Sequence, residues 1–172
     1  MFHASEETFA AKRYPPPGHA CRSRRRNHPR HLERRTSRPA AIDSIKAFKL
    51  CTGADNNSHV LEGTIDQSTR NDVTAIHFKQ TPAHASYGWH NDPEPQYVMT
   101  LSGTLAFVTR GGEKFTLHPG EVLIAEDNTG TGHRWNLVDD QPWRRGYVVL
   151  KPGAPDSFIP NDPAAAKVCK GS

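Results

Sequence analysis

Short apolar runs separated by turn-forming residues fill residues 42–152, and this spacing constrains the fold more than any other feature of the chain. The runs recur roughly every ten residues, and examples are "DVTAIHFK", "QYVMTL", "EVLIA" and "GHRWNLV". The separators are rich in Gly, Asn, Asp and Pro, as in "RGGE" and "EDNTGTG". Regularly spaced short strands are typical of an all-β sandwich or barrel. No long stretch with a period of 3.6 residues competes with this prediction.

The N-terminal 41 residues have a different composition and predict a disordered basic arm. Pro, Arg and His dominate this segment, which carries a net charge of +7, whereas the rest of the chain carries −3. A segment with so few apolar residues cannot bury enough surface to offset its ordering entropy. Three interpretations remain open: a targeting peptide, an arm that touches phosphate surfaces, or an extension without function. Because the folded part is mildly acidic, no nucleic-acid partner is expected.

The cysteines and the hydropathy pattern indicate the environment in which the protein is expected to work. Cys21, Cys51 and Cys169 are scattered, odd in number and form no C-x-x-C pair, so neither a zinc ribbon nor a disulfide framework is predicted. Reduced thiols and a cytoplasmic location are the simplest interpretation. No apolar stretch reaches about 18 residues, so no membrane partner is expected. Neither a phosphate-binding Gly-rich loop nor a nucleophile elbow is present.

Two polar segments carry the chemistry. The first, "GWHNDPEPQYVMTLSG", places His90, Asp92 and Gln96 directly before or on a strand-like run, and Pro93 and Pro95 exclude a helix there. The second, "HPGEVLIAEDNTGTGHRWN", contains a Pro-Gly-acid turn, a strand, a Gly-containing loop and His133. Polar side chains on a stiff segment that enters a sheet suit a binding or metal site.

These two segments resemble the two motifs of the cupin family, over about residues 74 to 150. The resemblance implies a double-stranded β-helix, also called a jelly roll or cupin barrel, that covers residues 42–152 and closes on an inner cavity, with residues 153–172 as a C-terminal tail. By position, His90 and His133 match two of the family's metal-binding histidines. Asp92 stands where a further His is expected, and Gln96 stands where a Glu is expected.

Three ligand arrangements follow from this resemblance. In the first, which we expect, His90, Gln96 and His133 converge on a divalent iron, manganese, nickel or zinc ion, and Asp92 lies at the rim. In the second, His90, Asp92 and His133 form a two-His-one-carboxylate face of the kind that holds non-haem iron, with Arg144 placed to bind an acid. In the third, no metal is bound and the same groups hydrogen-bond an organic ligand.

Further residues are expected around the ligand. Strand alternation predicts that Gln96 and Val98 share one face, as do His133 and Trp135. The ligand-binding residues expected from this pattern and from their neighbourhood in sequence are Trp89, Val98, Trp135 and Tyr147. Asp92 and His84 are the candidates for moving a proton.

The predicted function is that of a small cupin enzyme acting on a small oxygenated or aromatic metabolite. Metal-assisted isomerisation or cyclisation, lyase chemistry and dioxygenation all remain open. The alternative is a metal-free module that binds a small molecule without catalysis, and a third possibility is a purely structural oligomer. A homodimer is expected, because the early strands "SIKAFKL" and "HVLEGTI" are additional to the motif-bearing barrel and free strand edges are normally covered.

Overall fold

The computed structural model describes residues 44–169, and nearly all regular structure in this range is β-strand. The predicted N-terminal arm lies outside the described residues. The elements, in chain order, are β1 (Lys46–Thr52), β2 (Ser58–Ile65), β3 (Val73–Thr81), β4 (Ser86–His90), β5 (Gln96–Ser102), β6 (Leu105–Thr109), β7 (Lys114–Leu117), β8 (Val122–Glu126), β9 (His133–Leu137), β10 (Trp143–Leu150), β11 (Phe158–Pro160) and the short 3-10 helix η1 (Ala165–Val168).

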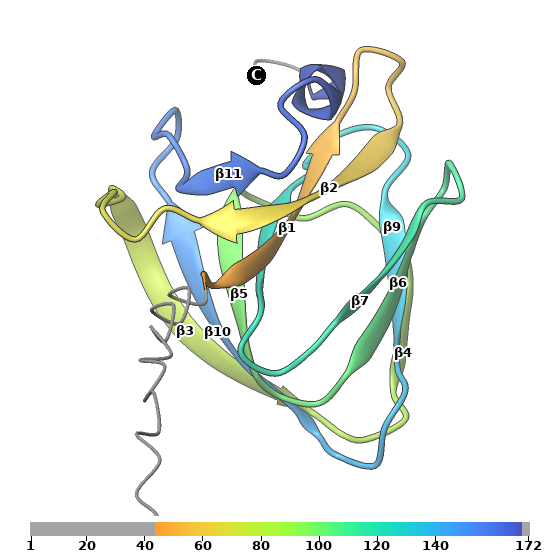
Figure 1. Cartoon of the computed structure of the whole chain (residues 1–172). Coiled ribbons are helices and arrows are strands. Elements are labelled where there is room, and N and C mark those ends of the chain that lie inside the picture. Colours follow the sequence, from red (N-terminus) through yellow and green to blue (C-terminus); the bar gives the residue numbers. More distant parts are fainter. Residues whose placement is uncertain (1–43, 170–172) are drawn as a thin grey trace, which may run out of the picture. The chain divides into compact units, whose positions relative to one another are not determined.

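The strands form two sheets that enclose one apolar core (Figure 1). The seven-stranded sheet has the order β11-β2-β1-β8-β5-β10-β3, and the four-stranded sheet has the order β4-β9-β6-β7. Among the pairs of these strands, β1 and β8 run parallel and the others run antiparallel. Side chains from both sheets meet in the largest core cluster, including Leu50 and Leu123 from one and Phe107 and Leu137 from the other. The predicted all-β jelly roll is therefore confirmed.

Strand alternation orients the residues that matter for function. In β9 every second residue is buried, so His133 points inward together with Trp135 and Leu137. Each large apolar side chain of such a row stabilises the fold by about 1.5–3 kcal/mol when it is fully buried. The polar ring of His133 thus sits at one end of an apolar row, and its direction is set by the same packing that holds the strand.

Two strands were not predicted from the sequence, and both affect the interpretation. β4 was missed because its sequence is short, contains Gly88 and has no apolar run typical of a strand. Most of its residues are exposed. β11 lies in the predicted C-terminal tail, but it pairs with β2 and so adds an edge strand to the larger sheet. β6 and β7 pair as a hairpin across the turn that contains Gly111 and Gly112.

The strand edges expected to form the dimer are already paired within the chain. β1 lies between β2 and β8, and β11 covers the outer edge of β2 from Gly63 to Ile65. The edge opposite β11 is β3, whose residues from Val73 to Gln80 are all exposed. The prediction of free edges is therefore wrong for β1 and for this part of β2, and the homodimer itself stays a prediction.

A disulfide between Cys51 and Cys169 links β1 to the residue that follows η1. Their Cα atoms lie 5.5 Å apart, although the two residues are separated by 118 positions in the chain. The expectation of reduced thiols is therefore wrong for this pair. The disulfide could not be predicted, because two cysteines so far apart in the chain form no recognisable spacing pattern. Cys21 lies outside the described residues. The cytoplasmic location stays a prediction, and the disulfide removes the argument from reduced cysteines that supported it.

Candidate metal and ligand site

His90 and His133 face each other across a strand pair. His90 is the last residue of β4 and His133 is the first of β9, and the two are register partners in the antiparallel pair. Their ring centroids are 4.3 Å apart. The sequence interpretation placed His90 on a loop, but it ends a strand, and this register brings it to His133. A hydrogen bond between Nδ1 of His90 and the carbonyl oxygen of Gly88, at 2.8 Å, leaves Nε2 for the site.

Gly132 makes this close approach possible. Its φ of +74° lies in the left-handed region, and a Cβ at this position would come within 2.3 Å of the carbonyl oxygen of His90. Only glycine satisfies both conditions without strain. The glycine directly before His133 is therefore needed to place β9 against the end of β4.

Asp92 joins the two histidines instead of lying at the rim. One ligand atom from each of His90, Asp92 and His133 lies within 4.8 Å of the other two. The Oδ2 atom of Asp92 is buried and has no hydrogen-bond partner among the described residues. The expectation that Asp92 lies at the rim is therefore wrong. The chain turns inward after β4, even though Pro93 stiffens the backbone at that point.

Gln96 lies beside Asp92. It begins β5, is only 4% exposed, and its Nε2 donates a long hydrogen bond of 3.4 Å to Oδ1 of Asp92. In this geometry Gln96 supports the carboxylate of Asp92 from one side. The two histidines and the carboxylate converge, and the amide of Gln96 lies beside the carboxylate.

Asp127 holds His133 from behind, whereas its place in the polar loop before His133 predicts a solvated side chain. Its Oδ2 lies 2.9 Å from Nδ1 of His133, and the two side chains are 0% and 2% exposed. A carboxylate that accepts from one ring nitrogen fixes the tautomer and leaves the other nitrogen available for a ligand. The only signal in the sequence was an acidic residue shortly before the motif histidine.

Burial and neighbouring charges shift the pKa values of these groups. Burial raises the pKa of Asp92 to about 7, and the nearby carboxylate of Asp127 adds to this effect. Burial also lowers the pKa of His90. Burial opposes charge on His133, but the hydrogen bond with Asp127 and the charges of Asp127 and Asp92 raise its pKa overall.

The donor set fits a divalent metal ion. Two imidazole nitrogens and one carboxylate oxygen are the ligands that iron, manganese, nickel or zinc accept in proteins. A cation here would also satisfy the buried Oδ2 of Asp92 and offset the repulsion between Asp92 and Asp127.

The cluster opens into a cavity of about 450 Å³. Two of the predicted ligand-binding residues, Trp135 and Tyr147, line it together with His90, Asp92 and Gln96. Its remaining lining residues are His77, Lys79, Tyr87, Asn91, Pro93, Glu94 and Arg145. The cavity therefore has aromatic walls and several polar groups, as small-molecule sites do.

Three predicted site residues lie elsewhere. His84 occupies a turn with φ of +61°, is 67% exposed and pairs with Asp140 at 2.9 Å, so it does not reach the cavity. Trp89 stacks with two guanidinium groups, those of Arg110 at 4.5 Å and Arg134 at 4.9 Å from its ring centroid. Val98 does point inward, but it packs in the apolar core below the cavity.

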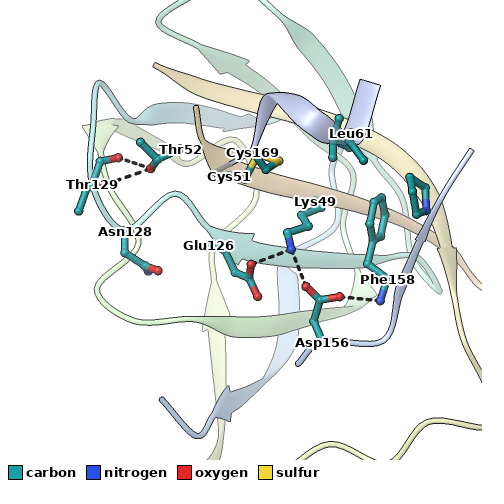
Figure 2. A pocket seen from close by; sticks show the side chains of 12 residues that line it. Lys49, Cys51, Thr52, Leu61, Glu126, Asn128, Thr129, Asp156, Phe158 and Cys169 are labelled. Atoms are coloured by element: carbon teal, nitrogen blue, oxygen red, sulfur yellow. Dashed lines mark hydrogen bonds and ion pairs between the residues drawn. A yellow bond between two sulfur atoms is a disulfide. The ribbon is translucent and has the colours of Figure 1, made fainter. Parts of the chain in front are cut away.

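A second cavity, of about 410 Å³, lies on the outer face of the larger sheet (Figure 2). Lys49 bridges two carboxylates in it, with Nζ 2.8 Å from Oε2 of Glu126 and 2.6 Å from Oδ2 of Asp156. The disulfide lies at its margin, and Thr52 donates a hydrogen bond of 2.7 Å to the carbonyl oxygen of Thr129. The charged groups in this cavity pair with one another. Through the ion pair of Lys49 with Asp156 they fasten the C-terminal segment to β1.

Comparison with known proteins identifies the family. The model of the cupin domain matches residues 76–145, a range that contains His90, Asp92, Gln96 and His133. Residues 76–145 thus form a cupin domain. No curated protein matches it. Within residues 44–169 no helix has the length and apolar character needed to cross a membrane.

Three solved structures are similar to this chain. One is a conserved protein of unknown function from Streptococcus pyogenes, with 20% identity, a TM-score of 0.35 and coverage of 49% of this chain and 68% of that one. The second is a cupin 2 conserved barrel domain protein from Salinispora arenicola, with 17% identity, a TM-score of 0.38 and coverage of 53% and 76%. The third is a protein from Neisseria meningitidis, with 16% identity, a TM-score of 0.36 and coverage of 51% and 89%.

Proposed function

We propose that this protein is a metal-dependent cupin enzyme that acts on a small oxygenated or aromatic metabolite. The observation that supports this proposal is the convergence of His90, Asp92 and His133, of which His90 and Asp92 line a cavity of about 450 Å³. These three residues would hold a divalent iron, manganese, nickel or zinc ion. This ligand set replaces the one expected from the sequence, in which Gln96 took the place of Asp92.

The chemistry would combine the ion with groups of the chain itself. When bound, a divalent ion polarises a carbonyl or enolate oxygen, which suits isomerisation or cyclisation, lyase reactions and dioxygenation alike. Gln96 holds the Asp92 carboxylate through its amide, and Asp127 fixes the His133 ring. The rings of Trp135 and Tyr147 line the cavity and reduce the access of water to a bound molecule.

Titration calorimetry with iron(II), manganese(II), nickel(II) and zinc(II) tests the ligand set. We expect Asp92→Asn and His133→Ala to lose most of the metal affinity, because each removes a direct ligand. Gln96→Ala should weaken binding by about tenfold, the effect of removing a group that orients a ligand. His84→Ala is the matched control and should bind as the wild type does. If Asp92→Asn and His133→Ala both bind metal with unchanged affinity, the proposed site is wrong.

A metal-free binding module is the second candidate function, and one observation favours it. Burial raises the pKa of Asp92 to about 7 and lowers that of His90, so near neutral pH these two groups can both be uncharged without a cation. Such groups can hydrogen-bond an uncharged oxygenated ligand directly. Elemental analysis of the purified protein separates the two functions: one metal ion per chain supports the enzyme, and a bound organic molecule without metal supports the module.

A further inference from the structure

Arg145 is a buried cation on the inward face of β10. Its residue surface is only 2% exposed. The strand register places it opposite Thr100 of β5 and Lys79 of β3, and Tyr147, two residues further along, lies opposite Val98 and His77. Since register partners point to the same side of a sheet, Arg145 faces the interior that also holds Gln96, and it lines the same cavity.

The partners of Arg145 are neutral. Its Nε donates to the hydroxyl of Tyr147 at 2.6 Å and its Nη1 to the hydroxyl of Thr81 at 2.9 Å. Its Cζ lies 3.5 Å from the ring centroid of Trp143. Within residues 44–169 no carboxylate forms an ion pair with this guanidinium, and none of its hydrogen bonds uses Nη2.

A buried charge without a counter-charge is costly, since the charge has lost its hydration shell. Arginine cannot escape this cost by losing its proton under ordinary conditions. Burial of Arg145 lowers its pKa, which reflects that same cost. A ligand with a negative charge would supply the missing partner, and the free side of the guanidinium fork matches a carboxylate.

The charges of the cavity wall are distributed along its length. Asp92 and Glu94 lie just before β5, beside Gln96, whereas Lys79 and Arg145 lie level with Thr100. Four residues along a strand span about 13 Å. The rings of Tyr147 and His77, which stack with centroids 4.7 Å apart, lie between the two ends. The acidic end holds the metal ligands, and the basic end has no fixed anion.

We propose that the ligand of this cavity is a small carboxylic acid, whose carboxylate pairs with Arg145 and Lys79 while its other oxygen-bearing end reaches His90 and Asp92. This inference rests on the proposed function for the metal end only. Binding of the ligand's carboxylate depends on Arg145 and not on the metal, so metal binding and carboxylate binding can be tested separately.

The probe for the basic end is sodium acetate, with acetamide as its uncharged counterpart of nearly the same shape and sodium chloride at equal ionic strength as the salt control. We expect acetate to raise the melting temperature of the wild-type protein and to shift the Nε–H resonance of Arg145 in NMR spectra, and acetamide and chloride to do neither. Arg145→Gln should weaken acetate binding at least about tenfold, the usual effect of losing a hydrogen bond to a charged group. Arg144→Gln is the matched control: it removes the same charge one residue away, where the side chain is exposed and donates to Gln80, and should leave acetate binding unchanged.

A wild-type protein in which acetate has no more effect than chloride on the Arg145 resonance overturns the inference, and this readout needs no variant to fold. Equal acetate affinity in Arg145→Gln and wild type overturns it as well. Metal titration of the same samples separates the two proposals. Acetate binding without metal binding contradicts the proposed enzyme but not the acid-binding end. Metal binding without acetate binding contradicts the acid-binding end alone.

Discussion

His133 lies between two carboxylates that act on it differently. Asp127 lies behind it, fully buried, and fixes the direction of the ring, whereas Asp92 lies beside it and points into the site. The Asp127 carboxylate makes the His133 ring a better electron donor, and the Asp92 carboxylate would bind the same cation as His133. One histidine thus links the interior packing of the domain to the chemistry of the cavity.

Gly132 sets the distance between the two histidines, so its replacement should damage the site. Gly132→Ala forces a Cβ against the carbonyl oxygen of His90 at a φ of +74°. We expect a lower melting temperature and a loss of metal affinity, because β9 must move away from the end of β4. Gly153→Ala is the control, since its φ of +78° imposes a similar strain of about 1–2 kcal/mol in open space. Thermal unfolding and metal titration of both variants make the comparison, and equal effects of the two substitutions on metal affinity would contradict this role of Gly132.

At the residue scale, the sequence predicted part of the site. His90 and His133 follow from the motif spacing, and Trp135 and Tyr147 follow from strand alternation. The inward turn of Asp92 and the burial of Asp127 depend on how two loops pack against each other, which no local pattern encodes. Arg145 was missed because an arginine next to another arginine in "RRGYVVLK" gives no sign of which one is buried.

At the scale of strands and turns, His59 connects two hairpins. Its ring lies 3.0 Å from Asp55, in the turn between β1 and β2, and 3.3 Å from Glu113, in the turn between β6 and β7. Glu113 also accepts a hydrogen bond of 3.0 Å from the backbone N–H of Val60. This contact joins the larger sheet to the smaller one at a turn.

The connection should depend on pH. Burial opposes charge on His59, but the hydrogen bonds and charges of Asp55 and Glu113 raise its pKa above the ordinary value of 6.5. The charged form therefore stabilises the folded state, fully below the ordinary value and no longer once the pH rises past the raised one. We expect Glu113→Gln to reduce the free energy of unfolding more at pH 6 than at pH 9. Urea unfolding at both pH values measures this difference, and Glu62→Gln, which removes an exposed ion pair with Lys46, is the control. A pH-independent effect of Glu113→Gln would contradict the prediction.

The sequence predicted where most strands lie in the chain better than it predicted how they pair in the sheets. Short apolar runs marked β5, β6 and β9, and in β6 and β9 every second residue is buried. The parallel pairing of β1 with β8 joins residues more than seventy positions apart, and it follows from the packing of the whole sheet. For the same reason no local pattern predicts that β11 pairs with β2.

At the scale of the whole molecule, β3 is an edge strand of the larger sheet with exposed apolar side chains. Ile76 and Phe78 of β3 are 60% and 73% exposed, and Leu101 of β5 is 60% exposed on the same sheet. Exposed apolar side chains on an edge strand are typical of an interface. The homodimer predicted from the sequence would therefore form through β3 in place of β1 and β2.

Sedimentation velocity tests this dimer. We expect the wild type to sediment as a dimer and Phe78→Glu as a monomer, because a buried carboxylate at the centre of the interface would have no partner. Ile159→Glu is the control: Ile159 is 49% exposed on β11, at the other edge of the larger sheet, and its substitution should leave the dimer intact. A wild type that sediments as a monomer at high concentration, or a Phe78→Glu variant that remains dimeric, would show that β3 is not the interface.

The link between Cys51 and Cys169 has a topological consequence. The bond closes a covalent ring that contains β2 to β11 and every residue proposed for the site. A single protease cut anywhere in that ring therefore leaves the two fragments joined, so the nicked protein would migrate as one species on a gel without reductant and separate into two only after reduction. The oxidised domain can thus lose the continuity of its backbone and still remain a single molecule.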